Sequence, residues 1–187
     1  MNPSNDERLS GSYALLTVHD RDNRLEVMKT IAGIEQIISA SAVDGDFDLV
    51  LQIRELPGAG IDKFVSNKIK TLPGVKSVEV CRVELAIGVD QMPRPVGENS
   101  EAKSANSHAE CFLFLETDKR NFEDIFSRLS VLQSVSSCEV ASGQFSLVLR
   151  LAAENFDYLD KVINEKIRPL PGVLRAKESR ILKLTGF

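Results

Sequence analysis

Two short motifs occur twice in the sequence, at one common spacing. Residues 45–51 read Gly-Asp-Phe-Asp-Leu-Val-Leu, and residues 72–75 read Leu-Pro-Gly-Val. Residues 143–149 read Gly-Gln-Phe-Ser-Leu-Val-Leu, and residues 170–173 again read Leu-Pro-Gly-Val. Both motifs return after 98 residues (143 − 45 and 170 − 72). Two separate motifs with one offset indicate an internal duplication, so we expect one structural unit used twice.

Each repeat has the same predicted order of strands and helices. Short apolar runs predict strands, and apolar residues at helical spacing predict helices. In the first repeat we expect strands at 13–18, 37–43, 47–54 and 75–85, with helices over 25–34 and 61–72. In the second we expect strands at 111–115, 135–141, 145–151 and 173–184, with helices over 122–132 and 156–170. The order βαββαβ predicts an α+β protein of two tandem ferredoxin-like repeats.

The central hairpin of the first repeat is predicted in more detail. Asp44-Gly45 is typical of a two-residue turn, which needs positive φ angles. The alternation after it places Phe47 on one strand face with Leu49, and Asp48 on the opposite face with Val50. Core packing is therefore expected for Phe47 and for its counterpart Phe145. Asp48 could either cap backbone groups or contact a ligand.

Several strands are apolar on both faces, which indicates cover on both sides. Residues 14–16 and 112–115 are continuous apolar runs, and Val50 and Val148 face away from the helices of their repeats. The helices of one repeat can cover only one face. We therefore expect the two antiparallel sheets to pack face to face as a pseudo-dimer. Pairing of each half with another chain is the alternative that remains open.

The predicted domain boundaries follow from this pattern. Residues 1–11 are expected to be a disordered N-terminal tail, and residues 12–86 form the first repeat. Residues 87–109 contain Pro, Gly, Ser and charged residues typical of a linker. Residues 110–187 form the second repeat.

Composition excludes several classes of function. The formal net charge is −4 and the pI is about 5.3, which gives no basic footprint for nucleic acid or an anionic membrane. The N-terminus is polar, unlike a signal peptide, and no apolar run could span a membrane. Cys81, Cys111 and Cys138 show no CxxC spacing and are expected to be free thiols in a reducing cytoplasm.

No catalytic or metal-binding constellation stands out. His19 and His108 are the only histidines and both are expected at the ends of elements; with the cysteines scattered, no metal-ligand cluster is visible. An RNA-recognition fold shares the βαββαβ order, but it needs aromatic residues on the exposed sheet face, where Asp48 and Gln52 are expected. The sequence therefore predicts no catalytic residue, metal or cofactor, and a protein that is not an enzyme.

Taken together, the two motifs and the element order resemble the effector-binding domain of the Lrp/AsnC (feast/famine) regulators. The resemblance covers residues 12–85 and 110–184. It implies ferredoxin-like domains that pair through their sheets, assemble into larger oligomers and bind amino acids or related metabolites near the glycine-containing hairpin. The effector-binding residues implied by the resemblance are Gly45, Asp46, Phe47 and Asp48, with Gly143, Gln144, Phe145 and Ser146 as their counterparts.

Two departures from the family shape the expected function. A helix-turn-helix is not expected in the short polar segment before the first strand, so direct DNA binding is not expected. Ser146 replaces the family's aspartate, so the first repeat is expected to be the binding-competent one. The hypothesis is a metabolite-sensing regulatory module that acts through homo-oligomerisation or a partner regulator. The alternative is a structural module that has no ligand and forms hetero-assemblies with helix-turn-helix-bearing regulators, helped by unpaired edge strands.

Overall fold

A computed structural model describes residues 11–54, 56, 60–88 and 109–183 of the chain. The tail predicted for residues 1–11 and the linker predicted for residues 87–109 lie almost wholly outside these residues, as does His108.

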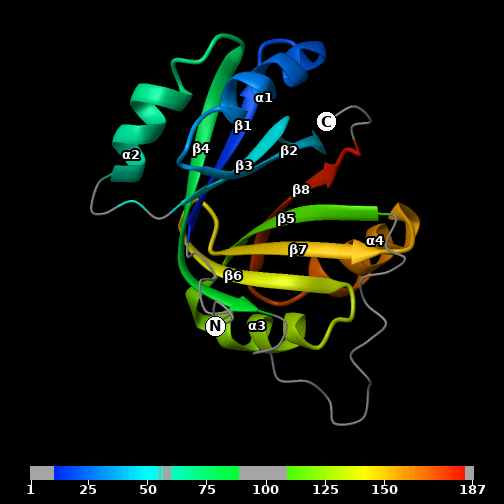
Figure 1. Cartoon of the computed structure of the whole chain (residues 1–187). Helices are drawn as coiled ribbons and strands as arrows, with labels where there is room; N and C mark the ends of the chain where they lie inside the picture. The colour runs from blue at the N-terminus through cyan, green and yellow to red at the C-terminus, as the bar shows by residue number, and fades with distance from the viewer. Residues whose placement is uncertain (1–10, 55, 57–59, 89–108, 184–187) are drawn as a thin grey trace, which may run out of the picture.

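Both repeats contain the predicted elements in the predicted order (Figure 1). The first repeat consists of β1 (Gly11–Val18), α1 (Arg24–Ala32), β2 (Ile37–Gly45), β3 (Leu49–Arg54), α2 (Gly60–Phe64) and β4 (Val75–Gly88). The second consists of β5 (Ala109–Thr117), α3 (Phe122–Ser130), β6 (Val135–Gly143), β7 (Leu147–Ala153), α4 (Phe156–Lys161) and β8 (Val173–Ile181). A 3-10 turn precedes each first helix, η1 (Arg21–Asn23) and η4 (Lys119–Asn121), and a π-helical segment continues each second helix, η2 (Val65–Ile69) and η5 (Val162–Ile167).

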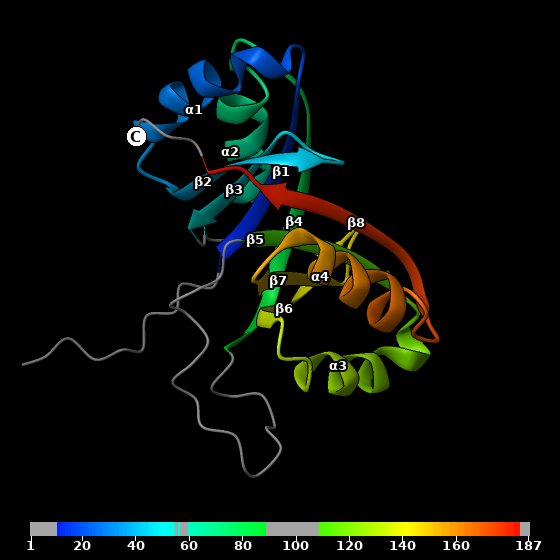
Figure 2. The ribbon, with the colours of Figure 1, turned by 90° about the vertical axis from the view of Figure 1, so that its right-hand side faces the viewer.

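The eight strands form one closed antiparallel barrel in the order β1-β3-β2-β8-β5-β7-β6-β4. Helices α1 and α2 cover the outside of the first half, and α3 and α4 cover the outside of the second (Figure 2). The prediction of two ferredoxin-like repeats with facing antiparallel sheets is confirmed. The barrel interior lies between the two sheets.

The outer strands of the two sheets pair with each other across two seams. Residues Cys81–Gly88 of β4 pair with Ser137–Gly143 of β6, in seven residue pairs. Residues Val43–Gly45 of β2 pair with Ser179–Ile181 of β8, in three. The expectation of unpaired edge strands is therefore wrong for these segments, because each repeat supplies the partner for the other's edges.

Three apolar cores follow from this arrangement. One lies between sheet and helices in each repeat, and the third fills the barrel. The barrel core consists of Tyr13, Leu15, Val43, Phe47, Val50, Cys81, Phe112, Phe114, Ala141, Phe145 and Val148. Phe47 was predicted to share a face with Leu49, which is wrong. Strand β3 begins at Leu49, so the preceding connection turns Phe47 into the barrel with Val50.

The predicted two-residue turn at Asp44-Gly45 is also wrong. Gly45 has φ +133°, but Asp44 does not have a positive φ, and the connection between β2 and β3 spans residues 46–48. Gly45 is needed for another reason. A Cβ at this position would lie 2.3 Å from the carbonyl oxygen of Glu178, so only glycine fits the β2–β8 seam.

Candidate functional site

A surface pocket of about 660 Å³ lies beside the central hairpin of the second repeat. Its walls come from the end of β5, the turn η4, the start of α3 and the β6–β7 connection. The lining residues are Glu116, Thr117, Lys119, Arg120, Phe122, Glu123, Gly143, Gln144 and Ser146. The volume is within the range typical of small-molecule sites.

The capping residue Asp118 fixes one wall of the pocket. Its side chain accepts hydrogen bonds from the backbone N–H of Arg120 at 3.1 Å and from the side chain of Asn121 at 3.3 Å. This cap starts η4 immediately after β5 and brings Lys119 and Arg120 to the pocket. Helix α3 follows directly, so Phe122 at its first position forms the apolar part of the wall.

Ser146 forms a neutral part of the opposite wall. Its hydroxyl oxygen accepts from the backbone N–H of Thr117 at 3.0 Å and lies 2.8 Å from the Thr117 hydroxyl. The Ser146 hydroxyl also lies 3.1 Å from the carbonyl oxygen of Leu115, to which it can donate. These contacts tie the hairpin to the end of β5 without a buried charge.

Gln144 connects the pocket to the other repeat. With its amide nitrogen directed toward β4, Gln144 donates to Glu79 Oε2 at 2.6 Å and accepts from Arg175 Nη1 at 3.1 Å. The second oxygen of Glu79 pairs with Lys177 Nζ at 3.5 Å. Glu79 and Lys177 occupy equivalent positions in the two repeats, 98 residues apart. The Lys177 ammonium lies 4.7 Å from the ring centroid of Phe47, which belongs to the barrel core.

The pocket carries charges of both signs. Within the described part of the chain, Lys119, Arg120 and Glu123 make no ion pair. Glu116 has a long contact with Arg175, 3.6 Å between carboxylate oxygen and Nε. Two cations and a carboxylate that pair with no described residue, placed around one apolar ring, suit a small zwitterionic ligand.

Of the eight effector-binding residues predicted from the sequence, the structure brings only second-repeat residues to the pocket. Gly143, Gln144 and Ser146 meet at the pocket, whereas Phe145 is buried in the barrel core. Their first-repeat counterparts do not line this pocket. Gly45 pairs with Ser179 in the seam, and exposed Asp46 donates its N–H to Glu178 at 3.2 Å.

The other two first-repeat residues, Phe47 and Asp48, are buried. Phe47 lies in the barrel core, and Asp48 accepts from Val18 N–H and pairs with Arg21. Whether any of these residues binds an effector, and in which repeat, stays a prediction.

Sequence reasoning missed the residues on the η4–α3 side of the pocket. The available signal was Asp118, because a cap between the first strand and first helix places the next residues beside the central hairpin. In the first repeat His19 separates the strand end from Asp20, whereas in the second Thr117 directly precedes Asp118. The tertiary placement of the Asp118 cap has no periodic signature in the sequence.

Other kinds of site find little support in the described residues. No three His, Cys, Asp or Glu side chains gather there to hold a metal ion. No described helix is long and apolar enough to cross a membrane. The prediction of free cysteines is confirmed, since all three thiols are buried and unpaired. Burial raises the pKa of each thiol to about 12, which makes the reactive thiolate scarce at neutral pH.

The sequence matches the Lrp/AsnC ligand binding domain over residues 14–83 and 110–185. The two segments cover both repeats, so the predicted resemblance and the duplication are confirmed. No curated protein matches the chain. The structure of E. coli AsnC aligns with this chain at 13% identity and a TM-score of 0.40. The alignment covers 46% of this chain and 58% of that chain. It therefore spans less than two thirds of that protein.

Two solved enzymes share the architecture of the whole tandem. The siroheme decarboxylase NirDL has a TM-score of 0.69 and 13% identity, covering 97% of this chain and 74% of that chain. A chlorite dismutase variant from Candidatus Nitrospira defluvii has a TM-score of 0.55 and 12% identity, covering 92% of this chain and 91% of that one. The prediction that the chain is not an enzyme, drawn from the lack of a catalytic constellation in the sequence, is not supported, because these neighbours show that enzymes adopt this same fold.

Proposed function

Because the chain belongs to the Lrp/AsnC ligand binding domain family, we propose that it is an effector-binding regulatory module for an amino acid or closely related metabolite. The observation that carries this proposal is the pocket beside the second-repeat hairpin. It combines charges of both signs with an apolar ring, within reach of the hairpin residues Gln144 and Ser146.

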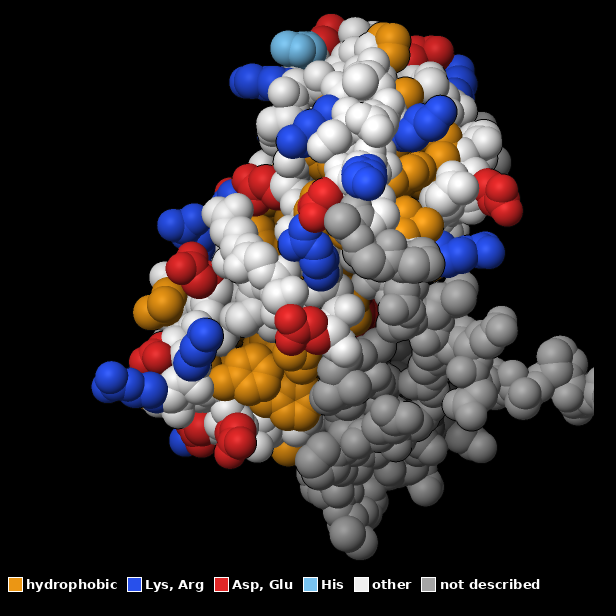
Figure 3. Space-filling model, turned by 90° about the vertical axis from the view of Figure 1, so that its left-hand side faces the viewer, with side chains coloured by type: hydrophobic (Ala, Val, Ile, Leu, Met, Phe, Trp, Pro, Cys, Tyr) orange, Lys and Arg blue, Asp and Glu red, His pale blue; other side chains and the backbone are white. Residues whose placement is uncertain are grey.

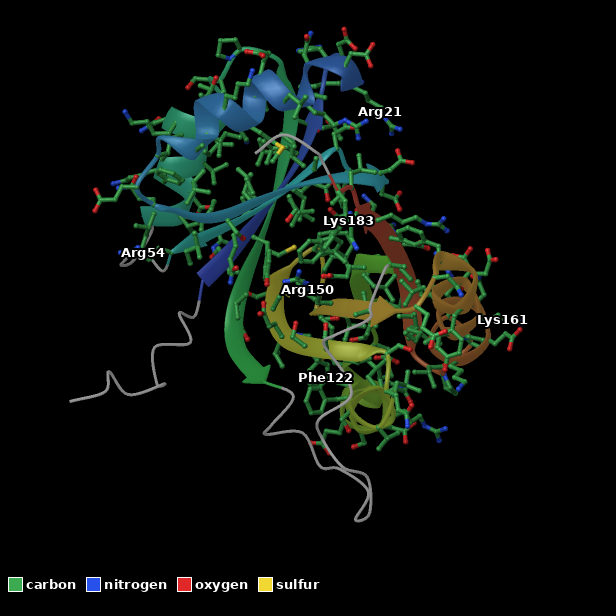
Figure 4. The ribbon with its side chains drawn as sticks, turned by 45° about the vertical axis from the view of Figure 1, so that its right-hand side comes forward. Arg21, Arg54, Phe122, Arg150, Lys161 and Lys183 are labelled. Carbon is green, nitrogen blue, oxygen red and sulfur yellow. The ribbon has the colours of Figure 1, made fainter. Side chains whose placement is uncertain are left out.

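The charges of the pocket match the two ends of an amino acid. Lys119 and Arg120 can bind the α-carboxylate, and Glu123 can bind the ammonium group. Phe122 offers an apolar surface to the ligand side chain (Figure 4), while Ser146 and Thr117 supply hydroxyl groups. A ligand with both charges replaces water around all of these groups, whereas a ligand with one charge leaves part of the site unsatisfied.

Regulation through oligomerisation or a partner protein, and not by direct DNA binding, is the second part of this proposal. On the face drawn in Figure 3, Lys and Arg side chains are interspersed with Asp and Glu, unlike the basic stripe of a nucleic-acid-binding surface. Gln144 gives a route for the signal, because it touches both the ligand pocket and the Glu79–Lys177 pair of the barrel. A ligand that takes Gln144 away from Glu79 changes a contact between the repeats.

A thermal-shift screen of the full chain against amino acids tests the proposal. A ligand present at 100 times its dissociation constant adds about 2.7 kcal/mol to the free energy of unfolding. We expect a stabilising amino acid in the panel, and we expect the double variant Lys119→Ala/Arg120→Ala to lose that shift. Lys161→Ala, an exposed lysine on α4, is the matched control and should keep it. A panel that shifts nothing, or a shift that survives in the double variant, contradicts the proposed site.

A second candidate, binding or conversion of a tetrapyrrole, is favoured by one observation. The whole tandem, and not one repeat alone, superposes on the siroheme decarboxylase, for which a complex with an iron-uroporphyrin III analogue has been solved. Titration of the chain with iron-uroporphyrin III separates the two candidates, because tetrapyrrole binding shifts the visible absorbance. Saturable binding at one equivalent supports the tetrapyrrole candidate, and an unchanged spectrum removes it.

A further inference from the structure

The two repeats face each other across an approximate two-fold axis, and one pair of opposite charges lies where equivalent positions of the repeats meet. We propose that this pair, Glu79 and Lys177, determines which repeats can face each other in the barrel. A first repeat accepts a second repeat and rejects another first repeat, and a second repeat likewise rejects its own kind. This property belongs to the barrel interface and does not depend on the function proposed for the second-repeat pocket.

The two seams establish the two-fold relation. Gly45 of β2 pairs with Ser179 of β8. The equivalent positions, 98 residues away in the other repeat, are Gly143 and Cys81, and these two residues pair across the β4–β6 seam. The next two residue pairs on each seam are equivalent in the same way. Each contact on one side of the axis thus has a counterpart on the other, and a position close to the axis faces its own counterpart.

Glu79 and Lys177 occupy such a self-facing position, at which a residue meets the equivalent residue of the other repeat. They lie 98 residues apart, on β4 and β8, with 3.5 Å between Glu79 Oε1 and Lys177 Nζ. The Lys177 ammonium lies 4.7 Å from the ring centroid of Phe47 and 5.6 Å from that of Phe145. These two rings are also equivalent residues, one from each repeat, so the ion pair lies close to the axis.

Two identical repeats would bring like charges together at the self-facing position. Two first repeats would oppose two glutamates, and two second repeats would oppose two lysines. The side chains are only 36% and 21% exposed, so water screens such a repulsion incompletely. Gln144, which donates to Glu79 at 2.6 Å, has Asp46 as its equivalent. Two first repeats would therefore add an aspartate to the repulsion.

A second contact between the repeats has the same requirement. Tyr13 of the first repeat donates a hydrogen bond to the partly buried carboxyl of Glu139 in the second. The residue equivalent to Tyr13 is Cys111, and the residue equivalent to Glu139 is Ser41. Two second repeats would leave the Glu139 carboxyl without the tyrosine hydroxyl, which is unfavourable for a group removed from water. Both contacts are therefore satisfied only by one repeat of each kind.

This rule defines the kind of partner that the barrel face fits. A repeat from another chain could replace the second repeat only if it carried a cation at the position of Lys177. Two copies of this chain could exchange repeats only reciprocally, with each first repeat facing a second repeat. Specificity of this kind arises from the repulsion in the wrong pair as well as from the attraction in the right one.

Charge reversals in the full chain reproduce the rejected contacts without separating the repeats. Lys177→Glu opposes two carboxylates at the self-facing position, and Glu79→Lys opposes two ammonium groups. In urea unfolding we expect each reversal to lower the ratio of folded to unfolded protein about tenfold more than the neutral variants Glu79→Gln and Lys177→Gln. The double reversal Glu79→Lys/Lys177→Glu should return to within about threefold of the wild type, because the charges are again opposite.

Salt and a surface pair provide the controls. In 1 M NaCl the Debye length falls to about 3 Å, so the extra loss in the single reversals should shrink. Glu26→Lys reverses one charge of an exposed ion pair with Lys29 on α1 and should change the ratio less than about threefold. A single reversal that cannot fold supports the proposal when the double reversal folds. Reversals no worse than the neutral variants, or a double reversal that recovers no stability, would overturn it.

Discussion

Glu139 is a titratable residue whose environment couples the two repeats. It lies on β6, next to β4, and contacts Tyr13 on β1 of the other repeat. Burial raises the pKa of the Glu139 carboxyl above its ordinary value, while the hydrogen bond from Tyr13 acts in the opposite direction and lowers it. Burial also raises the pKa of the Tyr13 hydroxyl, with Glu139 adding to the effect. The fold therefore disfavours the ionised form of Glu139.

This environment gives a pH dependence with a definite sign. A carboxyl whose pKa is raised on folding destabilises the protein once it ionises, so the free energy of unfolding should fall as pH rises from about 4.5 through the raised pKa. Glu139→Gln should not show this fall in the free energy of unfolding. The variant should be more stable than the wild type at pH values above the raised pKa, but not at pH values below about 4.5. Tyr13→Phe should make the loss larger, because it removes a hydrogen bond to the carboxylate. Urea unfolding across pH measures both, and parallel pH profiles for wild type and Glu139→Gln would contradict this account.

Gly45 provides a second test at the level of one residue. In Gly45→Ala the new Cβ would meet the Glu178 carbonyl at 2.3 Å in a backbone conformation that L-residues rarely adopt. We expect a loss of about 1–3 kcal/mol in the free energy of unfolding. Gly33→Ala is the control, because its Cβ would meet nothing within 4 Å. Equal stability of the two variants in urea unfolding would show that the seam tolerates a side chain at position 45.

At the scale of elements, the two seams that close the barrel are unequal. The β4–β6 seam has seven residue pairs and the β2–β8 seam has three. Fewer hydrogen-bonded pairs should make local opening less costly. In hydrogen-exchange mass spectrometry we expect the amides of 43–45 and 179–181 to exchange faster than those of 81–88 and 137–143. Slower exchange at the β2–β8 seam would contradict this ranking.

The elements were predictable from the sequence, but their junctions were not. Local periodicity and turn residues define each strand and helix, and a shared offset defines the repeat. The face of Phe47 was predicted wrongly because β3 begins two residues later, at Leu49, so the two-residue alternation of a strand does not extend to Phe47. The role of Gly45 depends on Glu178, which is more than 130 residues away in the chain. Lys119 lies at the pocket because its cap, Asp118, starts η4 beside the hairpin, and such a tertiary placement has no periodic signature.

At the scale of the whole molecule, the two repeats share one core and should unfold together. Phe114 from the second repeat packs against Phe47 from the first at 5.7 Å and against Phe145 at 5.6 Å between ring centroids. All three rings are almost fully buried in the barrel. Each repeat alone would expose this apolar face to water.

We therefore expect a single cooperative unfolding transition. Phe114→Ala should lower the free energy of unfolding by about 3–5 kcal/mol, because it removes a large buried ring. Urea unfolding followed by circular dichroism measures both quantities. Two separate transitions in the wild type would show that the repeats are independent domains joined by a linker.

The central claim, that the second-repeat pocket is the effector site, is tested most directly by NMR mapping of a bound amino acid on the full chain. The ligand is the amino acid with the largest stabilising effect in the thermal-shift screen. We expect saturable chemical-shift changes at the amides of Thr117, Arg120, Gly143 and Ser146, with the first-repeat hairpin around Gly45 unchanged. Shifts centred on Gly45 and Asp48, or no saturable shift at the four pocket amides, would contradict the claim.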